Sequence, residues 1–134
     1  MVEKIIWYVV FTSKDVKPHK CQMFLKKNFY HCFCFRQIDD VVYYIDPTTA
    51  DISSSVYIDT SAYELAKDFA LKNKKFYKVL QIEKEYDFNN RICSLRNMIP
   101  NCVNVVKMFI GLKSWSQTPY QLYKHLLRNN ARIL

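Results

Sequence analysis

Runs of apolar residues in the first third of the chain have the length and composition of β-strands. Ile5 to Phe11 is β-branched and aromatic throughout, which predicts a strand that is buried on both sides. Phe29 to Arg36 and Val41 to Asp46 predict two further strands. The residues 37–40 between them predict a turn, and Pro47 is expected to end the third strand.

The middle of the chain predicts two more strands. The polar stretch 48–55 indicates a loop, and Ser55 to Asp59 indicates a short strand. Phe76 to Tyr86 alternates in character along its length, which is typical of a long strand with two different faces. Two longer connections are expected, a basic loop at 13–28 with a helical turn at 21–25 and a segment at 87–100 with a helical turn at 92–95.

Three helices are expected from capping signals and from apolar residues at three- and four-residue steps. Their expected starts and ends are Thr60 or Ser61 to about Asn73, Asn101 to Gly111, and Thr118 with Pro119 onward. Glu64 lies at the capping-box position for Ser61. The expected inward faces are Tyr63, Ala66, Phe69 and Ala70; Val103, Val106, Phe109 and Ile110; and Tyr120, Leu122, Tyr123, Leu126 and Leu127. Lys124, His125, Arg128 and Arg132 make the other side and the end of the last helix basic.

Length and composition suit one compact domain. The 134 residues are 50% hydrophobic, so we expect a single domain over residues 1–134. The expected fold class is α+β, with an antiparallel sheet of about four or five strands packed against the helix that carries Cys102 and a C-terminal helix. No apolar run approaches the roughly 18 residues that span a bilayer, and Met1 to Lys4 leads directly into a strand, so neither a membrane span nor a signal peptide is expected.

The net charge of +8 favours acidic partners such as nucleic acid, an anionic surface or a negatively charged neighbour in an assembly. Frequent Lys, Asn and Ile also fit a bias of the coding sequence, so the charge alone argues weakly. The five cysteines are an odd number without a Cys-x-x-Cys pair, which predicts a reducing compartment and not a disulfide framework. A zinc site of His31, Cys32, Cys34 and a distant cysteine would need both faces of one strand, so no metal or cofactor is expected.

Cys102 lies in the first turn of the second expected helix. There the thiol meets the positive end of the helix dipole and free N–H groups, which favour the nucleophilic thiolate. The backbone N–H of Cys102 is also a candidate oxyanion donor. A free cysteine is more often a small buried hydrophobe, and for Cys102 taken alone that alternative is favoured.

His31 and Asp46 are candidate partners of this cysteine. If residues 37–40 form a four-residue loop, counting outward places His31 directly opposite Asp46 on one face of the hairpin. A carboxylate in that position can hold the imidazole and stabilise its cation. A loop of two or three residues would shift the register and weaken the pairing. With a base in reach, Cys102 can form a thiolate–imidazolium pair.

The pattern His-x14-Asp-Pro from His31 to Pro47 resembles the His–Asp strand pair of transglutaminase-like and other papain-superfamily enzymes. The segment from Asn101 to Val106 resembles the Asn-Cys motif of the permuted, NlpC-type branch, which includes relatives of lecithin:retinol acyltransferase. His and Asp precede Cys here, which is the permuted order. The resemblance implies Cys102 as nucleophile, His31 as base and Asp46 as the orienting residue. The chain departs from the pattern because it lacks a Gly-rich loop and because the third polar residue of the NlpC branch is often His. The segment 115–127 is similar to small phage-encoded proteins of this type.

Two functions of different classes are therefore expected. The first is a thiol hydrolase or acyltransferase of the cysteine peptidase or amidase type, which acts on an amide or ester bond of a peptide or acyl substrate. The alternative is a non-catalytic structural or adaptor protein, such as a phage virion component, that contacts neighbouring proteins in a particle. Nucleic-acid binding through the lysines is a third and weaker interpretation. The expected location is a reducing cytoplasm or a phage particle.

Overall fold

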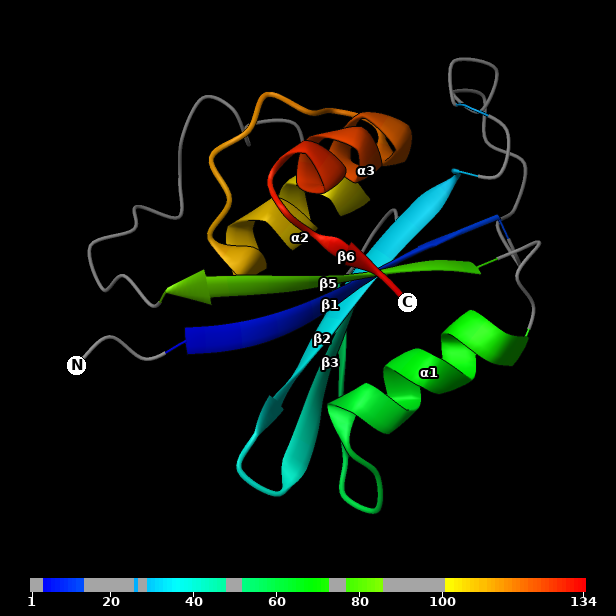
Figure 1. Cartoon of the computed structure of the whole chain (residues 1–134), viewed down its shortest axis with the longest axis vertical. Coiled ribbons are helices and arrows are strands. Elements are labelled where there is room, and N and C mark those ends of the chain that lie inside the picture. The colour runs from blue at the N-terminus through cyan, green and yellow to red at the C-terminus, as the bar shows by residue number, and fades with distance from the viewer. Residues whose placement is uncertain (1–3, 14–25, 27–28, 48–51, 73–76, 86–100) are drawn as a thin grey trace.

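The computed structural model describes residues 4–13, 26, 29–47, 52–72, 77–85 and 101–134. Within these residues, three helices and a six-stranded antiparallel sheet form an α+β structure (Figure 1). The strands are β1 (Lys4–Thr12), β2 (His31–Ile38), β3 (Val41–Pro47), β4 (Ile52–Tyr57), β5 (Tyr77–Glu85) and β6 (Arg132–Ile133). The helices are α1 (Ala62–Lys72), α2 (Cys102–Ile110) and α3 (Pro119–Arg128).

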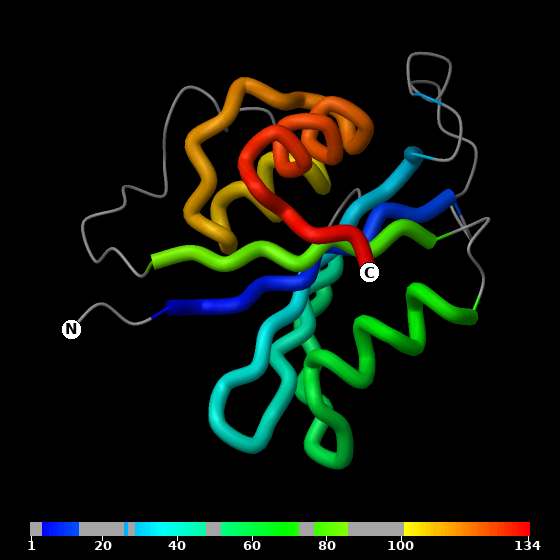
Figure 2. Tube along the Cα trace, viewed as in Figure 1, coloured from blue at the N-terminus to red at the C-terminus, as the bar shows by residue number. Residues whose placement is uncertain are grey.

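The sheet has the strand order β4-β3-β2-β1-β5-β6, and helices cover both of its faces. α2 and α3 pack on one face and α1 packs on the other (Figures 1 and 2). β1 lies in the centre between β2 and β5, so its residues Tyr8 to Phe11 are buried on both sides. This confirms the burial expected from the unbroken apolar run.

Alternate residues of the central strands supply two separate cores. Beneath α2 and α3, the core contains Val9, Phe11, Cys32 and Cys34 together with helix residues such as Val103. Beneath α1, the core contains Tyr8, Val10, Phe33, Phe35, Ala62 and Ala66. His31 is the first residue of β2, and its ring contacts Phe33 of the core beneath α1.

The expected helix caps are present. Ser61 Oγ accepts the N–H of Glu64 at 3.1 Å, and the Glu64 carboxylate accepts the N–H of Ser61 at 3.3 Å, which completes a capping box. α3 begins with a capping box formed by Thr118 and Gln121. At the end of α2, Gly111 adopts φ 66, a left-handed conformation that favours glycine.

Several expected strand and helix positions need correction. β4 begins at Ile52, so the serines expected in a loop belong to a strand, because their backbones pair with β3 at the edge of the sheet. β6 was not expected, since two residues are too short to show a period, and it places Arg132 in the sheet. Tyr63 on α1 and Phe109 on α2 are 51% and 44% exposed, so neither belongs to an inward face.

The helical turns expected at 21–25 and 92–95 lie outside the described residues, as does most of both long connections. No helix in the described part of the chain is long and apolar enough to cross a membrane.

Candidate functional site

The hairpin that carries His31 and Asp46 has a two-residue turn at 39–40, where a four-residue turn was expected. Asp39 adopts φ 52, a left-handed conformation that Asp tolerates better than most residues. Ile38 therefore pairs with Val41, and the register differs from the expected one by two residues. Because side chains alternate with a period of two, a shift of two leaves every side chain on its expected face.

His31 and Asp46 meet diagonally across the hairpin. Extending the observed register places Asp46 opposite Phe33, two residues along β2 from His31. Diagonal neighbours on one face are roughly 7–8 Å apart, which long side chains can bridge. The His31 Nε2 and Asp46 Oδ1 atoms are 2.6 Å apart, and the two side chains are 22% and 32% exposed. The pairing is therefore formed, and the expectation that a two-residue loop would weaken it is wrong.

Cys102 is the first residue of α2, as its sequence environment predicted. The helix is capped by Asn101, whose Oδ1 accepts the N–H of Asn104 at 2.8 Å. α2 packs on β2 and β3, and Val103 beside Cys102 lies in the same core as Cys32. Cys102 is near enough to the His31 ring and to Cys32 for both residues to shift its pKa. Asp46 occupies Nε2 of His31, so Nδ1 is the ring nitrogen that remains for another partner.

The surroundings of Cys102 stabilise its thiolate. The hydrogen bond with the Cys32 side chain contributes most to lowering the pKa of Cys102 well below its usual range. Burial opposes this effect, and the hydrogen bond and positive charge of His31 add to it. Its position at a helix N-terminus favours the anion as well.

The imidazole of His31 is stabilised as a cation. Burial lowers the pKa of His31, but hydrogen bonds to Asp46 and Cys102, with the attraction of their negative charges, outweigh burial and raise the pKa to about 9. Near neutral pH the proton therefore resides on the imidazole, and the sulfur is a thiolate. Of the three residues expected from the sequence, His31 and Asp46 are hydrogen-bonded, and Cys102 interacts electrostatically with His31.

The sequence analysis did not identify Cys32 as a neighbour of Cys102 that affects its pKa. Its side chain is fully buried in the core beneath α2, and burial raises the pKa of its thiol, so it stays protonated and can donate to the Cys102 sulfur. Strand alternation places Cys32 and His31 on opposite faces of β2, but both reach Cys102 because the site lies at the strand end. The signal in the sequence was the adjacency of Cys32 to His31.

Cys34 lies one step deeper in the same core, where burial raises the pKa of its thiol. Within the described residues, no group of three or more His, Cys, Asp or Glu side chains is arranged to hold a metal ion. His125 lies on α3, away from the pair formed by His31 and Asp46.

Comparisons with protein-family models, with curated proteins and with solved structures returned no match to this chain. The interpretation of the site therefore depends on its geometry and chemistry.

Proposed function

We propose that the protein is a cysteine-dependent hydrolase or acyltransferase of permuted papain-like type, acting on an amide or ester carbonyl. The observation that supports this most strongly is the His31–Asp46 hydrogen bond beside Cys102, with His31 and Cys102 shifting each other's pKa toward an imidazolium and a thiolate. The three residues come from a helix N-terminus and two adjacent strands. A cysteine on a helix packed against an antiparallel sheet, with His and Asp earlier in the chain, agrees with the permuted order.

Each residue has a definite part in the proposed reaction. The Cys102 thiolate attacks the carbonyl carbon, and the electron pair of the C=O bond moves to the oxygen. The backbone N–H of Cys102 stabilises this oxyanion at the helix N-terminus. His31 gives its proton to the departing amine or alcohol, which leaves a thioester on Cys102.

The second half of the reaction reuses the same groups. Water or an amine attacks the thioester, His31 accepts the proton of the attacking group, and the sulfur departs as a thiolate. Asp46 holds the imidazole in place and stabilises its cation throughout. Water gives hydrolysis, and an amine gives acyl transfer.

The proposal is tested by the reaction of the protein with p-nitrophenyl acetate and with iodoacetamide. We expect a burst of about one equivalent of p-nitrophenol, which reports acylation, and steady release thereafter. Cys102→Ala abolishes both phases. Alkylation is followed by peptide-resolved mass spectrometry, so that the reaction of Cys102 is separated from that of the other cysteines.

His31→Ala decides whether the imidazole activates the thiol. The variant removes the contribution of His31 to lowering the Cys102 pKa and keeps that of Cys32, so the pKa of Cys102 should rise and its alkylation rate at pH 7 should fall. His125→Ala and Cys34→Ala are matched controls that change neither Cys102, His31 nor Asp46, and both variants should retain the burst. An unchanged Cys102 alkylation rate in His31→Ala would contradict the proposed relay.

The alternative function, a structural or adaptor protein, is favoured by the exposed edge strand β4. Ile52 and Val56 are each 50% exposed, and Ile58 just beyond the strand is 70% exposed. An edge strand with apolar side chains can add a strand from another protein. If Val56→Lys with Ile58→Lys abolishes assembly into a particle while Cys102→Ala does not, the adaptor function is supported over the catalytic one.

A further inference from the structure

Acidic residues are confined to the first part of the chain. All 12 Asp and Glu residues lie at or before Asp87, so the remaining segment contains no acidic side chain. That segment holds seven Lys and Arg residues, namely Arg91, Arg96, Lys107, Lys113, Lys124, Arg128 and Arg132. A general bias toward lysine in the coding sequence does not explain why the acids are segregated. The segregation of the acidic residues is therefore stronger evidence for an acidic partner than the net charge alone.

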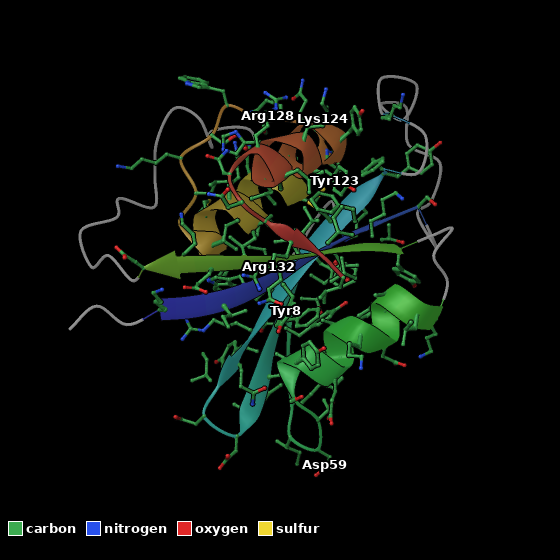
Figure 3. The ribbon with its side chains drawn as sticks, in the orientation of Figure 1. Tyr8, Asp59, Tyr123, Lys124, Arg128 and Arg132 are labelled. Carbon is green, nitrogen blue, oxygen red and sulfur yellow. The ribbon has the colours of Figure 1, made fainter. Side chains whose placement is uncertain are left out.

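Because of this segregation, the layer formed by α2, α3 and the loop between them is basic. Residues 101–134 form α2, α3, the loop between them and the short edge strand β6, and the two helices with their loop cover one face of the sheet. Figure 3 shows the side chains of Lys124 and Arg128 on the outer side of α3, away from the sheet, whereas Tyr123 lies on the inner side, where it packs on Phe11. The acidic side chains of the described residues belong to other elements, so they do not neutralise this layer from within.

An open groove of about 370 Å³ runs along the outer side of α3. It is lined by Trp115, Ser116, Tyr120, Gln121, Lys124, His125 and Arg128. Every titratable side chain in that lining other than tyrosine is basic, and none of the lining residues is Cys102, Cys32, His31 or Asp46. Lys26 and Lys124 lie over the Tyr120 ring at 5.4 and 5.6 Å, which adds positive charge beside the groove.

Two titratable groups indicate the positive potential of this layer independently. Burial lowers the pKa of His125, and the nearby charges of Arg128 and Lys107 lower it further. On the side of β5 that meets the end of α2, burial and the charge of Lys113 lower the pKa of Lys84. For both groups burial is the larger cause, and the nearby like charges add to it.

Trp115 narrows the class of anion that fits the groove. Its side chain is 67% exposed at the groove wall. An exposed indole beside cations is suited to stacking on a nucleobase while the cations contact phosphates. A phosphate ion, an acidic peptide or a lipid headgroup would use the cations but has no base to stack.

We propose that this groove binds single-stranded nucleic acid, with Trp115 stacking on a base and Lys124 and Arg128 contacting neighbouring phosphates. Binding is sequence-tolerant, since every base offers an aromatic face. The site is independent of the proposed chemistry at Cys102, so each can fail without the other.

The test measures the anisotropy of a fluorescein-labelled ten-nucleotide oligothymidine during titration with the full-length protein at several salt concentrations. Each phosphate contact on a single strand contributes about 0.7 to the slope of log K against log salt. Lys124→Ala with Arg128→Ala is therefore expected to reduce the slope by about 1.4. Trp115→Ala should weaken binding roughly tenfold with an unchanged slope, because stacking is not ionic.

A matched control removes the same number of charges from the opposite face. Lys67 and Lys72 are on α1, and Lys67 lies over Tyr63 at 5.5 Å, much as Lys124 lies over Tyr120. Lys67→Ala with Lys72→Ala should leave the salt slope unchanged. An equal loss in this control would overturn the proposal, because the binding would then be non-specific attraction to net charge.

Acidic competitors test the ligand class. Polyglutamate and vesicles containing phosphatidylserine are expected to compete much more weakly than unlabelled oligothymidine at equal charge. Equal competition by either, or full affinity in Trp115→Ala, would show that the groove recognises charge alone and would refute its assignment to nucleic acid.

Discussion

Asp46→Asn is the most direct perturbation of the proposed relay, because it removes one negative charge with little change in side-chain size. Asp46 Oδ1 lies 2.6 Å from His31 Nε2. The amide oxygen of asparagine can still occupy this position, but it carries no charge. The variant therefore separates the electrostatic effect of Asp46 from its role in holding the imidazole.

The size of the effect follows from the pKa of His31, which is about 9 against an ordinary value of 6.5. At 1.36 kcal/mol per pH unit, the environment stabilises the imidazolium by about 3 kcal/mol. Asp46 and Cys102 share this stabilisation against the cost of burial. Because a close opposite charge typically changes a pKa by roughly 1–3, we expect the His31 pKa to fall from about 9 to about 6–8 in Asp46→Asn.

The assay follows the histidine ring protons by NMR as a function of pH. The chain has 3 His residues, so the signal of His31 is identified by its loss in His31→Ala. The rate of Cys102 alkylation is measured over the same pH range and should rise at a higher pH in Asp46→Asn, because a less stable imidazolium stabilises the thiolate less. Asp68→Asn is the matched control, since Asp68 pairs with Lys72 at 3.3 Å on exposed α1.

An unchanged titration of His31 in Asp46→Asn, with the alkylation profile also unchanged, would refute the assignment of Asp46 as the stabilising partner. A His31 pKa near its ordinary value in the wild-type protein would refute the thiolate–imidazolium pair as a whole.

Three further predictions concern the same end of the sheet. Cys32→Ala is expected to raise the pKa of Cys102, measured by its alkylation rate against pH, because the variant removes the hydrogen bond that contributes most to lowering it; Cys34→Ala should have little effect. Asn101→Ala should destabilise the protein by about 1 kcal/mol in urea unfolding, through loss of the helix cap, whereas Asn101→Asp should preserve stability. The raised His31 pKa adds stability that is lost as pH rises toward about 9, and the lowered Cys102 pKa adds stability that is lost as pH falls below its ordinary 9.0. Between pH 6.5 and 9, Cys102 and His31 together hold one proton in the folded and in the unfolded protein. The difference in unfolding free energy between wild type and the His31→Ala, Cys102→Ala double variant should therefore be constant over this range and decrease below pH 6.5. A steady change of that difference with pH between 6.5 and 9 would contradict the pairing.

Local signals were sufficient for most of the fold. β1 was evident from its unbroken apolar run, and the ends of α2 from Asn101 and Gly111, since capping depends on residues adjacent in sequence. β4 was misplaced because its serines carry no apolar pattern and are held in the strand by backbone pairing with β3. Pairing of that kind depends on the rest of the sheet, which local sequence does not encode.

The His31–Asp46 pair shows why a wrong loop length still gave the right partners. The prediction depended on both residues sharing a face, and face membership survives any shift of an even number of residues. A three-residue loop would have placed Asp46 on the other face and separated the pair. The parity of the loop mattered more than its length, and side chains as long as His and Asp tolerated the diagonal geometry.

Lys107 is fully buried on α2 although it was not among the residues expected on the inward face of that helix. It lies in the stripe Val103, Val106, Lys107 and Ile110, at the spacing of a buried helical face, and its side chain is fully buried. A buried ammonium group needs hydrogen-bond acceptors, and Lys107 Nζ donates to the carbonyl oxygens of Ser114 and Ser116 at 2.8 and 2.7 Å.

These two bonds connect the proposed sites. The carbonyl groups that Lys107 binds flank Trp115, so the helix that positions the Cys102 sulfur at its N-terminus also fixes the groove wall near its C-terminus. The Asn104 side chain adds a second link, since its Nδ2 donates to Gln117 Oε1 at 3.2 Å. A lysine within an apolar helical stripe therefore indicates a segment of backbone that must fold against that helix to supply acceptors. In this chain that segment carries the exposed indole, which explains how a loop without regular structure can hold a large aromatic ring at a defined place beside α3.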